Sequence, residues 1–239
     1  MTSSSVPQTA LVTGGSRGIG LAIARALVRE GVRVALVARG AQELEARARE
    51  LGNGTLAVAA DVSISTEVDR VILRIRDEFG GVPDLLVNNA GIFDPKPMQV
   101  LTGEEFERMV RVNLVAPFFV LRAILPEWRE QRRGHVIMIG SIADRAIFPG
   151  NSAYSASKFG ARAMHEVLRA ETRGTGVRAT LVSPSSTDTP IWDEVLQQPD
   201  NRFPARSQML SADSVADAVV WAATRPRNVN VDELRITAS

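Results

Sequence analysis

The chain has 239 residues, of which 45% are hydrophobic, so it can bury one sizeable core and has the length of one α/β domain. Its 28 basic and 27 acidic residues nearly cancel, which excludes a strong electric field that would draw the protein to nucleic acid or a membrane. The absence of cysteine excludes disulfides and thiolate metal sites, and two histidines, His135 and His165, are too few for most zinc sites, so we predict no metal.

Residues 1–7 are mostly small and polar, and they lack the basic start and apolar stretch of a signal peptide. We expect them to form a disordered tail ahead of one domain over residues 8–239. No apolar run approaches the roughly 20 residues that span a bilayer. The sequence therefore predicts a cytoplasmic protein whose partners are small molecules and other copies of itself, with no nucleic acid and no membrane.

Short β-branched runs alternate with longer amphipathic stretches along the chain, a pattern typical of βαβ units around a parallel sheet. We expect a doubly wound, Rossmann-like α/β fold of about seven strands with helices on both faces. Thr102 and Glu105 predict a capping box that opens one long helix, and Ser211 predicts the cap of another helix that ends before Pro226. The predicted strands cover residues 9–13, 32–37, 55–60, 85–87, 136–139, 178–182 and 234–237.

A glycine-rich turn follows the first predicted strand and runs into the amphipathic stretch 21–30. Glycine lets a backbone turn tightly and approach a pyrophosphate, and the free N–H groups at a helix start attract its charge. This strand, turn and helix context is the one that a dinucleotide fingerprint requires. We therefore predict a pyrophosphate-binding turn that comprises Gly14, Ser16, Arg17, Gly18, Ile19 and Gly20.

The same turn contains a G-x-S-x-G pattern centred on Ser16, which raises the alternative of a serine hydrolase. A nucleophile elbow needs a histidine base and an earlier strand for its oxyanion hole, whereas this turn follows the first strand. His135 begins a predicted strand and His165 lies within a predicted helix. The sequence favours dinucleotide binding, and we interpret both histidines as structural.

Cofactor choice depends on the end of the second predicted strand, where an acidic residue would bind the ribose 2′-hydroxyl of NAD. The sequence has Arg39 there and no carboxylate. Arg39 and Arg17 can bind a 2′-phosphate through forked hydrogen bonds. The sequence therefore predicts NADP(H) as the cofactor.

Further motifs are Asn88-Asn89-Ala90-Gly91 after the fourth predicted strand, Ser141 after the fifth, and Tyr154-Ser155-Ala156-Ser157-Lys158 at the start of the next helix. Together with the T-G-x-x-x-G-x-G spacing of the glycine turn, they resemble the short-chain dehydrogenase/reductase family over nearly the whole chain. The resemblance implies an oxidoreductase in which Asp61 and Val62 contact the adenine. It also implies cofactor contacts by Asn89, Ala90, Gly91, Tyr154, Lys158, Pro184, Thr187 and Thr189.

Tyr154 is the only tyrosine in the chain, and Lys158 lies four residues later on the same face of the predicted helix. A phenol with a pKa of ~10 is a poor acid-base catalyst at neutral pH, and a nearby ammonium stabilises the phenolate. We therefore predict that Lys158 lowers the pKa of Tyr154. In the resembled family the lysine also holds the nicotinamide ribose, the residue matching Ser141 hydrogen-bonds the substrate oxygen, and the tyrosine exchanges its proton.

The resemblance assigns the fourth catalytic position to Asn113. Pro117 lies four residues later and lacks an N–H, so the carbonyl of Asn113 loses its usual helical partner and the helix should kink. The resemblance implies that this carbonyl binds a water linking Lys158 to bulk solvent. A kink that serves packing alone is the alternative.

Residues 185–211 are irregular and follow the carboxyl end of a strand, which makes them a candidate substrate loop. Ser185 replaces the glycine usual in the resembled family, and this predicts backbone strain. Arg145 could bind a carboxylate, whereas apolar side chains predicted to border the pocket favour an apolar substrate. These are Ile147, Phe148 and Trp192. The loop prolines are Pro190, Pro199 and Pro204.

The motifs together predict an NADP(H)-dependent carbonyl reductase, 3-oxoacyl reductase or alcohol dehydrogenase with Tyr154 as general acid or base. A 3-hydroxy acid dehydrogenase of the same family is an alternative, because residues 231–237 are similar to that branch. A non-catalytic NADP(H)-binding regulator is the alternative from another class.

The resemblance also implies a homotetramer or homodimer that pairs the helix after Thr102 with the helix carrying Tyr154. An apolar series in the first helix supports this pairing, although a core face explains it equally well. The series is Phe106, Met109, Val110, Leu114, Phe118 and Leu121.

Overall fold

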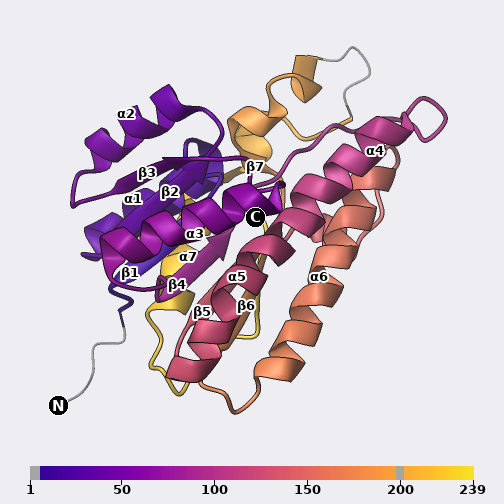
Figure 1. Ribbon diagram of the computed structural model, residues 1–239. Coiled ribbons are helices and arrows are strands. Elements are labelled where there is room, and N and C mark those ends of the chain that lie inside the picture. Colours follow the sequence, from indigo (N-terminus) through magenta and orange to yellow (C-terminus); the bar gives the residue numbers. More distant parts are fainter. Residues whose placement is uncertain (1–5, 198–201) are drawn as a thin grey trace.

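The computed structural model describes residues 6–197 and 202–239 (Figure 1). Its main sheet contains seven parallel strands in the order β3-β2-β1-β4-β5-β6-β9. Each strand begins and ends within two residues of its predicted bounds, and the predicted fold class is confirmed. Residues 1–5 of the predicted tail and Pro199 lie outside the described ranges. The strands are β1 (Thr9–Thr13), β2 (Arg33–Ala38), β3 (Leu56–Ala59), β4 (Leu85–Asn88), β5 (His135–Ile139), β6 (Arg178–Pro184) and β9 (Glu233–Ile236).

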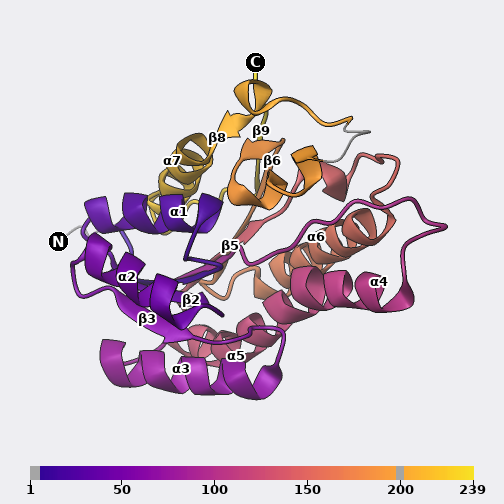
Figure 2. The ribbon, with the colours of Figure 1, turned by 90° about the horizontal axis from the view of Figure 1, so that it is seen from above.

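Helices cover both faces of the sheet (Figure 2). Alternate residues of β2 serve the two layers, since Val34 and Leu36 belong to one core cluster and Ala35 and Val37 to the other. Both faces are therefore buried, which explains the continuous apolar runs in the sequence. One layer contains α1 (Gly18–Arg29), α2 (Ala41–Leu51) and α7 (Ala212–Ala223), and the other contains α3 (Ser65–Phe79), α5 (Ala116–Gln131) and α6 (Ser152–Thr172).

The chain changes direction across the sheet between the neighbouring strands β1 and β4. From β1 the order runs outward through β2 and β3, and from β4 it runs the other way through β5, β6 and β9. The helices that follow β1 and β4 pack on opposite faces of the sheet, and open α/β sheets bind ligands in the crevice at such a point. Residues 14–20 and 88–91, the two predicted cofactor motifs, follow these strands.

A long helical run precedes β5 and combines α4 (Gly103–Val110), a π turn (Arg111–Val115) and α5. The predicted capping box opens it, since Thr102 Oγ1 accepts a hydrogen bond from the Glu105 N–H and the Glu105 carboxylate accepts one from the Thr102 N–H. The kink predicted from Pro117 takes the form of the π turn, in which i→i+5 hydrogen bonds replace i→i+4 bonds. Ser211 caps α7 as predicted.

By length and composition alone, the run Gly103–Gln131 could cross a bilayer, contrary to the expectation that no segment approaches that length. Val120, Ile124 and Trp128 are buried in the core between this run, α3 and the sheet. Arg111 and Arg122 are exposed. We interpret the run as a core helix of a globular domain with one outward face.

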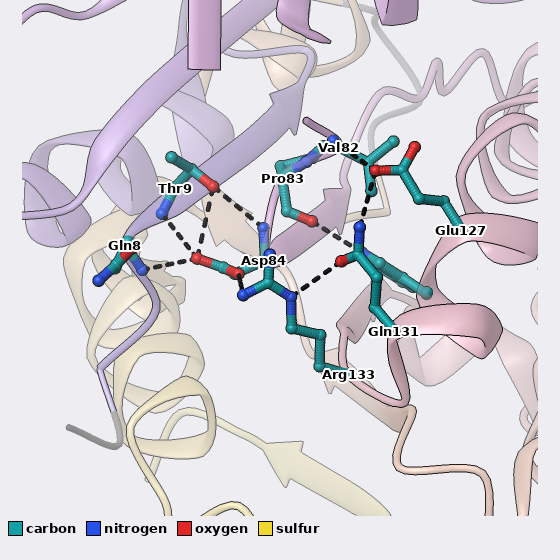
Figure 3. Close-up of polar contacts among 9 residues, drawn as sticks. Gln8, Thr9, Val82, Pro83, Asp84, Glu127, Gln131 and Arg133 are labelled. Atoms are coloured by element: carbon teal, nitrogen blue, oxygen red, sulfur yellow. Dashed lines mark hydrogen bonds and ion pairs between the residues drawn. The ribbon is translucent and has the colours of Figure 1, made fainter. Parts of the chain in front are cut away.

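A polar network at the amino ends of the strands joins the start of β1 to β4 and α5 (Figure 3). The Asp84 carboxylate accepts hydrogen bonds from the N–H groups of Gln8 (2.9 Å) and Thr9 (3.2 Å), and the Asp84 N–H donates to Thr9 Oγ1 (3.1 Å). Nearby, Trp128 Nε1 donates to the Pro83 carbonyl at 2.8 Å. These bonds fix the amino ends of β1 and β4, at the end of the sheet opposite the crevice.

Two buried histidines predict a pH-dependent stability. Both ring nitrogens of His165 find no hydrogen-bond partner among the described residues, and burial, with the charge of Arg169, lowers its pKa from 6.5 to about 4 against the opposing charge of Asp232. Burial also lowers the pKa of His135. Unfolded His165 therefore takes up a proton at a higher pH than the folded residue. The contribution of the buried, neutral His165 to the free energy of unfolding is fully present above pH ~6.5. It decreases as the pH falls toward 4, by roughly 3 kcal/mol for one such residue.

We expect His165→Leu, which keeps a similar volume without polar atoms, to reduce this loss. The measurement is the free energy of unfolding in denaturant for wild type and variant at pH 8 and pH 5. The variant should lose less stability between the two pH values, with a residual loss from His135. Equal losses in the two proteins would contradict this account of His165.

Candidate active site

The glycine turn packs between the ends of β2 and β4. The N–H groups of Gly14 and Gly15 both donate to the Val37 carbonyl, at 2.8 and 3.3 Å. Gly14 has a φ of +66°, and a Cβ there would lie 2.9 Å from Ala90 Cα. A Cβ on Gly20 would lie 2.2 Å from the Gly14 carbonyl oxygen. Neither position admits a side chain, so glycine keeps the turn tight at the start of α1.

Asn89 ties the loop after β4 to this turn. Its Nδ2 donates to the carbonyls of Thr13 (2.9 Å) and Gly14 (3.2 Å). The N–H groups of Asn89 and Ala90 donate in turn to Thr13 Oγ1, at 3.0 and 3.1 Å. The loops from β1 and β4 therefore form one connected wall of the crevice.

A cleft of about 440 Å³ opens along this wall and reaches the ends of β5 and β6. The helix α1 begins there without a side-chain cap and without an acidic residue in its first turn. Its free N–H groups, beside Arg17, suit a pyrophosphate, so these residues fit a dinucleotide cofactor. The predicted cofactor residues that line the cleft are Gly14, Arg17, Gly18, Ile19, Asn89, Ala90, Gly91, Tyr154, Lys158, Pro184, Thr187 and Thr189.

The other predicted cofactor residues lie outside this lining. Arg39 is exposed beyond the end of β2, two residues after the carbonyl that the glycine turn binds. Burial opposes ionisation of Asp61, but hydrogen bonds from Ser63 and the charge of Arg39 outweigh it and lower the pKa of Asp61. Arg39 therefore lies close to an ionised carboxylate. Three further residues are buried, namely Ser16, Gly20 and Val62.

Ser141, Tyr154 and Lys158 converge at the carboxyl end of β5 and line the cleft. Tyr154 is half-buried in the first turn of α6, and its phenol is hydrogen-bonded with the Ser141 hydroxyl. Lys158 is buried, and its Nζ donates to the Ile139 carbonyl (3.1 Å) and lies 5.6 Å from the centroid of the Tyr154 ring. The structure thus brings the three predicted side chains together.

The protonation of Tyr154 differs from the prediction. Burial raises the pKa of Tyr154 to about 12, the hydrogen bond with Ser141 opposes this rise, and the charge of Asp144 adds to it. Burial likewise lowers the pKa of Lys158 to about 8 against the charge of Asp144. The expectation that Lys158 lowers the pKa of Tyr154 is wrong here, because burial dominates and the ammonium donates to the Ile139 carbonyl. Tyr154 is a neutral phenol at neutral pH.

Asn113 is buried in the π turn, and its side chain holds two neighbouring segments together. Oδ1 accepts a hydrogen bond from the Ile92 N–H (2.8 Å), and Nδ2 donates to the Ile92 carbonyl (3.0 Å) and to Ser157 Oγ (3.1 Å). The side chain therefore clamps the loop after β4 against α6, which the sequence did not reveal. The role assigned to its main-chain carbonyl stays a prediction.

Of the residues predicted to contact the substrate, some line the cleft and others do not. Phe148 and Trp192 line the cleft, whereas Ile147 is 75% exposed and lies outside the lining. Arg145 is not free to bind a carboxylate, since its Nε donates to Asp144 (2.7 Å) and its guanidinium pairs with Glu233. The predictions for Ile147 and Arg145 are therefore wrong.

Two residues of the site were missed. Asp144 is fully buried behind Ser141 and accepts a hydrogen bond from Ser183 Oγ at 2.6 Å. Its place three residues after Ser141, as the acidic end of a capping box, was a signal for it. The Phe93 ring lies 4.8 Å from that of Tyr154, and nothing in its sequence position indicated this contact.

The strain predicted at Ser185 is absent. Among the described residues, positive φ values outside glycine occur at Asn53 and Arg132 alone. The Ser185 N–H donates to the Ile236 carbonyl at 2.8 Å, so the backbone continues the pairing of β6 with β9. Two short parallel strands, which the sequence did not predict, pair near the two ends of the candidate substrate loop. They are β7 (Thr187–Asp188) and β8 (Leu210–Ser211).

The serine hydrolase alternative lacks a base. His135 begins β5, at the edge opposite the crevice, and its Nε2 is hydrogen-bonded with Thr180 Oγ1 (2.8 Å). His165 is fully buried in α6, and Ser16 is buried in the glycine turn.

Within residues 6–197 and 202–239, no group of three or more His, Asp or Glu side chains is placed to hold a metal ion.

Known proteins match the chain over nearly its whole length. The family described as short chain dehydrogenase matches residues 8–200. An uncharacterised oxidoreductase of Staphylococcus epidermidis is 35% identical over 229 residues, which cover 96% of each chain. An alcohol dehydrogenase from the archaeon Thermococcus sibiricus, complexed with 5-hydroxy-NADP, is 31% identical with a TM-score of 0.85, over 97% of this chain and 96% of that one. A closed serine dehydrogenase complexed with NADP⁺ is 29% identical with a TM-score of 0.87, over 95% and 93% of the two chains.

Proposed function

The chain belongs to the short-chain dehydrogenase family, and from this premise we propose that it is an NADP(H)-dependent oxidoreductase that acts on a carbonyl compound or a secondary alcohol. The observation that carries the proposal is the convergence of Ser141, Tyr154 and Lys158 on a cleft that also holds the uncapped start of α1. When bound, the nicotinamide cofactor supplies or accepts the hydride. The protein contributes the binding surface and the proton.

Tyr154 is arranged to give a proton to a carbonyl oxygen. The phenol is protonated at neutral pH and so carries the proton that a general acid gives, while burial, which raises its pKa to about 12, makes it a weaker acid than a free phenol. The Ser141 hydroxyl lies beside it and can donate a second hydrogen bond to the same oxygen. Asn113 fixes the loop after β4 against α6, which holds these groups in register.

Preference for NADP(H) is supported by Arg17 at the start of α1 and Arg39 beyond β2, with no carboxylate at the end of β2. Both solved structures described above contain forms of NADP. The experiment that tests the function is a screen of ketones, aldehydes and 3-hydroxy acids with NADPH, NADH and their oxidised forms, followed by nicotinamide absorbance. We expect carbonyl reduction with NADPH. Preference for a 3-hydroxy acid would favour the alternative within the family, and tight NADPH binding without turnover would favour a regulator.

We also propose that the protein assembles through α4, α5 and α6. Of the apolar series in this run, Met109 and Leu121 are buried in the core, whereas Phe106 and Phe118 are 38% and 47% exposed. Phe159 on α6 is also exposed. We expect a dimer or tetramer by light scattering, and Phe118→Glu should shift it toward monomer, because the new charge would be buried in the contact. A mass near 25.8 kDa for wild type across a dilution series would overturn the proposal.

A further inference from the structure

Three aromatic rings form a closed triangle at the substrate end of the cleft. The centroid of Phe93 lies 5.0 Å from that of Trp192 and 5.7 Å from that of Phe203, and Trp192 lies 5.2 Å from Phe203. The interplanar angles are 63°, 80° and 60°, so the rings meet at steep angles. All three line the cleft, and we call them the aromatic triangle.

The aromatic triangle adjoins the proton donor. The Phe93 ring meets the Tyr154 ring edge-on, with centroids 4.8 Å apart. A carbonyl oxygen that accepts a hydrogen bond from Tyr154 therefore has its carbon substituents within reach of Phe93. A substituent on the reacting carbonyl carbon can therefore contact these rings.

The rings are held in place by their surroundings. Trp192 is only 8% exposed, and its Nε1 donates to the Thr187 carbonyl at 3.0 Å. Val195 and Met209 pack in the same small core. Because these contacts exist before a substrate arrives, little side-chain freedom is lost on binding.

The charges near the aromatic triangle offer little attraction for an acidic substituent. Arg145 is occupied by Asp144 and Glu233, and Lys158 donates to the Ile139 carbonyl. Arg202 lines the cleft but is exposed to solvent, where it can do little to offset the desolvation of a buried anion. Among the described residues, the lining contains no aspartate or glutamate that would attract a cationic substrate.

We propose, on the basis of the proposed function, that the preferred substrates are uncharged aryl ketones or aryl aldehydes whose ring packs against the aromatic triangle. Edge-to-face and offset contacts favour an aromatic ring over a saturated ring of similar size, by about two- to tenfold for one contact. A saturated ring buries similar apolar area but lacks these contacts.

The test compares kcat/KM with NADPH for acetophenone, cyclohexyl methyl ketone and benzoylformate. We expect acetophenone to exceed cyclohexyl methyl ketone by about two- to tenfold, and benzoylformate to be the poorest of the three. Phe93→Leu and Phe203→Leu should each move the aryl to cyclohexyl ratio toward one. Trp221→Leu, at an exposed aromatic residue on α7, should leave the ratio unchanged. The ratio is the readout because partial unfolding would lower both rates equally.

Binding of 1-phenylethanol and 1-cyclohexylethanol by calorimetry, with NADPH present, separates this proposal from the proposed function. Selective binding of the aryl alcohol that weakens in Phe203→Leu supports the aromatic triangle even if no carbonyl is reduced. Equal or tighter binding of the cyclohexyl alcohol overturns the proposal, as does a higher kcat/KM for cyclohexyl methyl ketone or benzoylformate, whether or not the proposed function holds.

Discussion

Replacing Tyr154 with phenylalanine is expected to lower kcat by about 10²–10⁴-fold, the usual contribution of general acid-base catalysis. The variant deletes the hydroxyl whose proton passes to the substrate oxygen, and it keeps the ring that packs against Phe93. Because the lost interaction belongs to the transition state, kcat/KM should fall with kcat. The measurement is NADPH consumption with a carbonyl that wild type reduces. NADPH affinity, measured by fluorescence titration, should stay nearly unchanged.

Lys158→Ala provides the contrast. This variant removes a buried ammonium that donates to the Ile139 carbonyl, together with the ribose contact that the family likeness implies. Cofactor affinity and turnover should therefore fall together, whereas Tyr154→Phe separates them. Near-normal kcat in Tyr154→Phe on any substrate of wild type would overturn the mechanism, because the chain has no second tyrosine to take over.

The sequence predicted the framework of the site because that framework depends on local pattern. Apolar runs predict the strands. Glycine is required at positions 14 and 20, where a Cβ would clash with neighbouring backbone atoms. The four-residue spacing of Tyr154 and Lys158 places both on one helical face. The Thr102 capping box follows from side-chain chemistry within one turn. Each of these inferences needs only residues that are close in sequence.

The wrong predictions concern interactions that depend on the whole fold. The pKa of Tyr154 is set by burial, by the hydrogen bond with Ser141 and by the charge of Asp144, which a pairwise argument from Lys158 alone could not include. Arg145 is neutralised in part by Glu233, from a strand that follows it by almost ninety residues. Ser185 escapes strain because β9 pairs with it. Long-range contacts therefore decide the charges and the substrate end of the cleft.

The charge reversal Arg39→Asp is expected to weaken NADPH binding by roughly 1.5–3 kcal/mol, with little effect on NADH, so that the cofactor preference shrinks or inverts. The substitution removes a guanidinium that can bind the 2′-phosphate and puts a carboxylate there that repels it. That carboxylate would also stand near Asp61, whose pKa Arg39 now helps to lower, so two acidic groups would lie close together there. Dissociation constants for NADPH and NADH, measured at one ionic strength, provide the comparison.

Arg49→Asp is the matched control, because Arg49 lies on α2 with its side chain 72% exposed and the change in net charge is the same. A general electrostatic effect on a polyanionic cofactor would appear in both variants, whereas a 2′-phosphate contact appears in Arg39→Asp alone. The ratio of NADPH to NADH affinity should therefore fall for Arg39→Asp and stay at the wild-type value for Arg49→Asp. If wild type binds NADH more tightly than NADPH, Arg39 does not select the cofactor. The absence of a carboxylate at the end of β2 then does not indicate a preference for NADP(H).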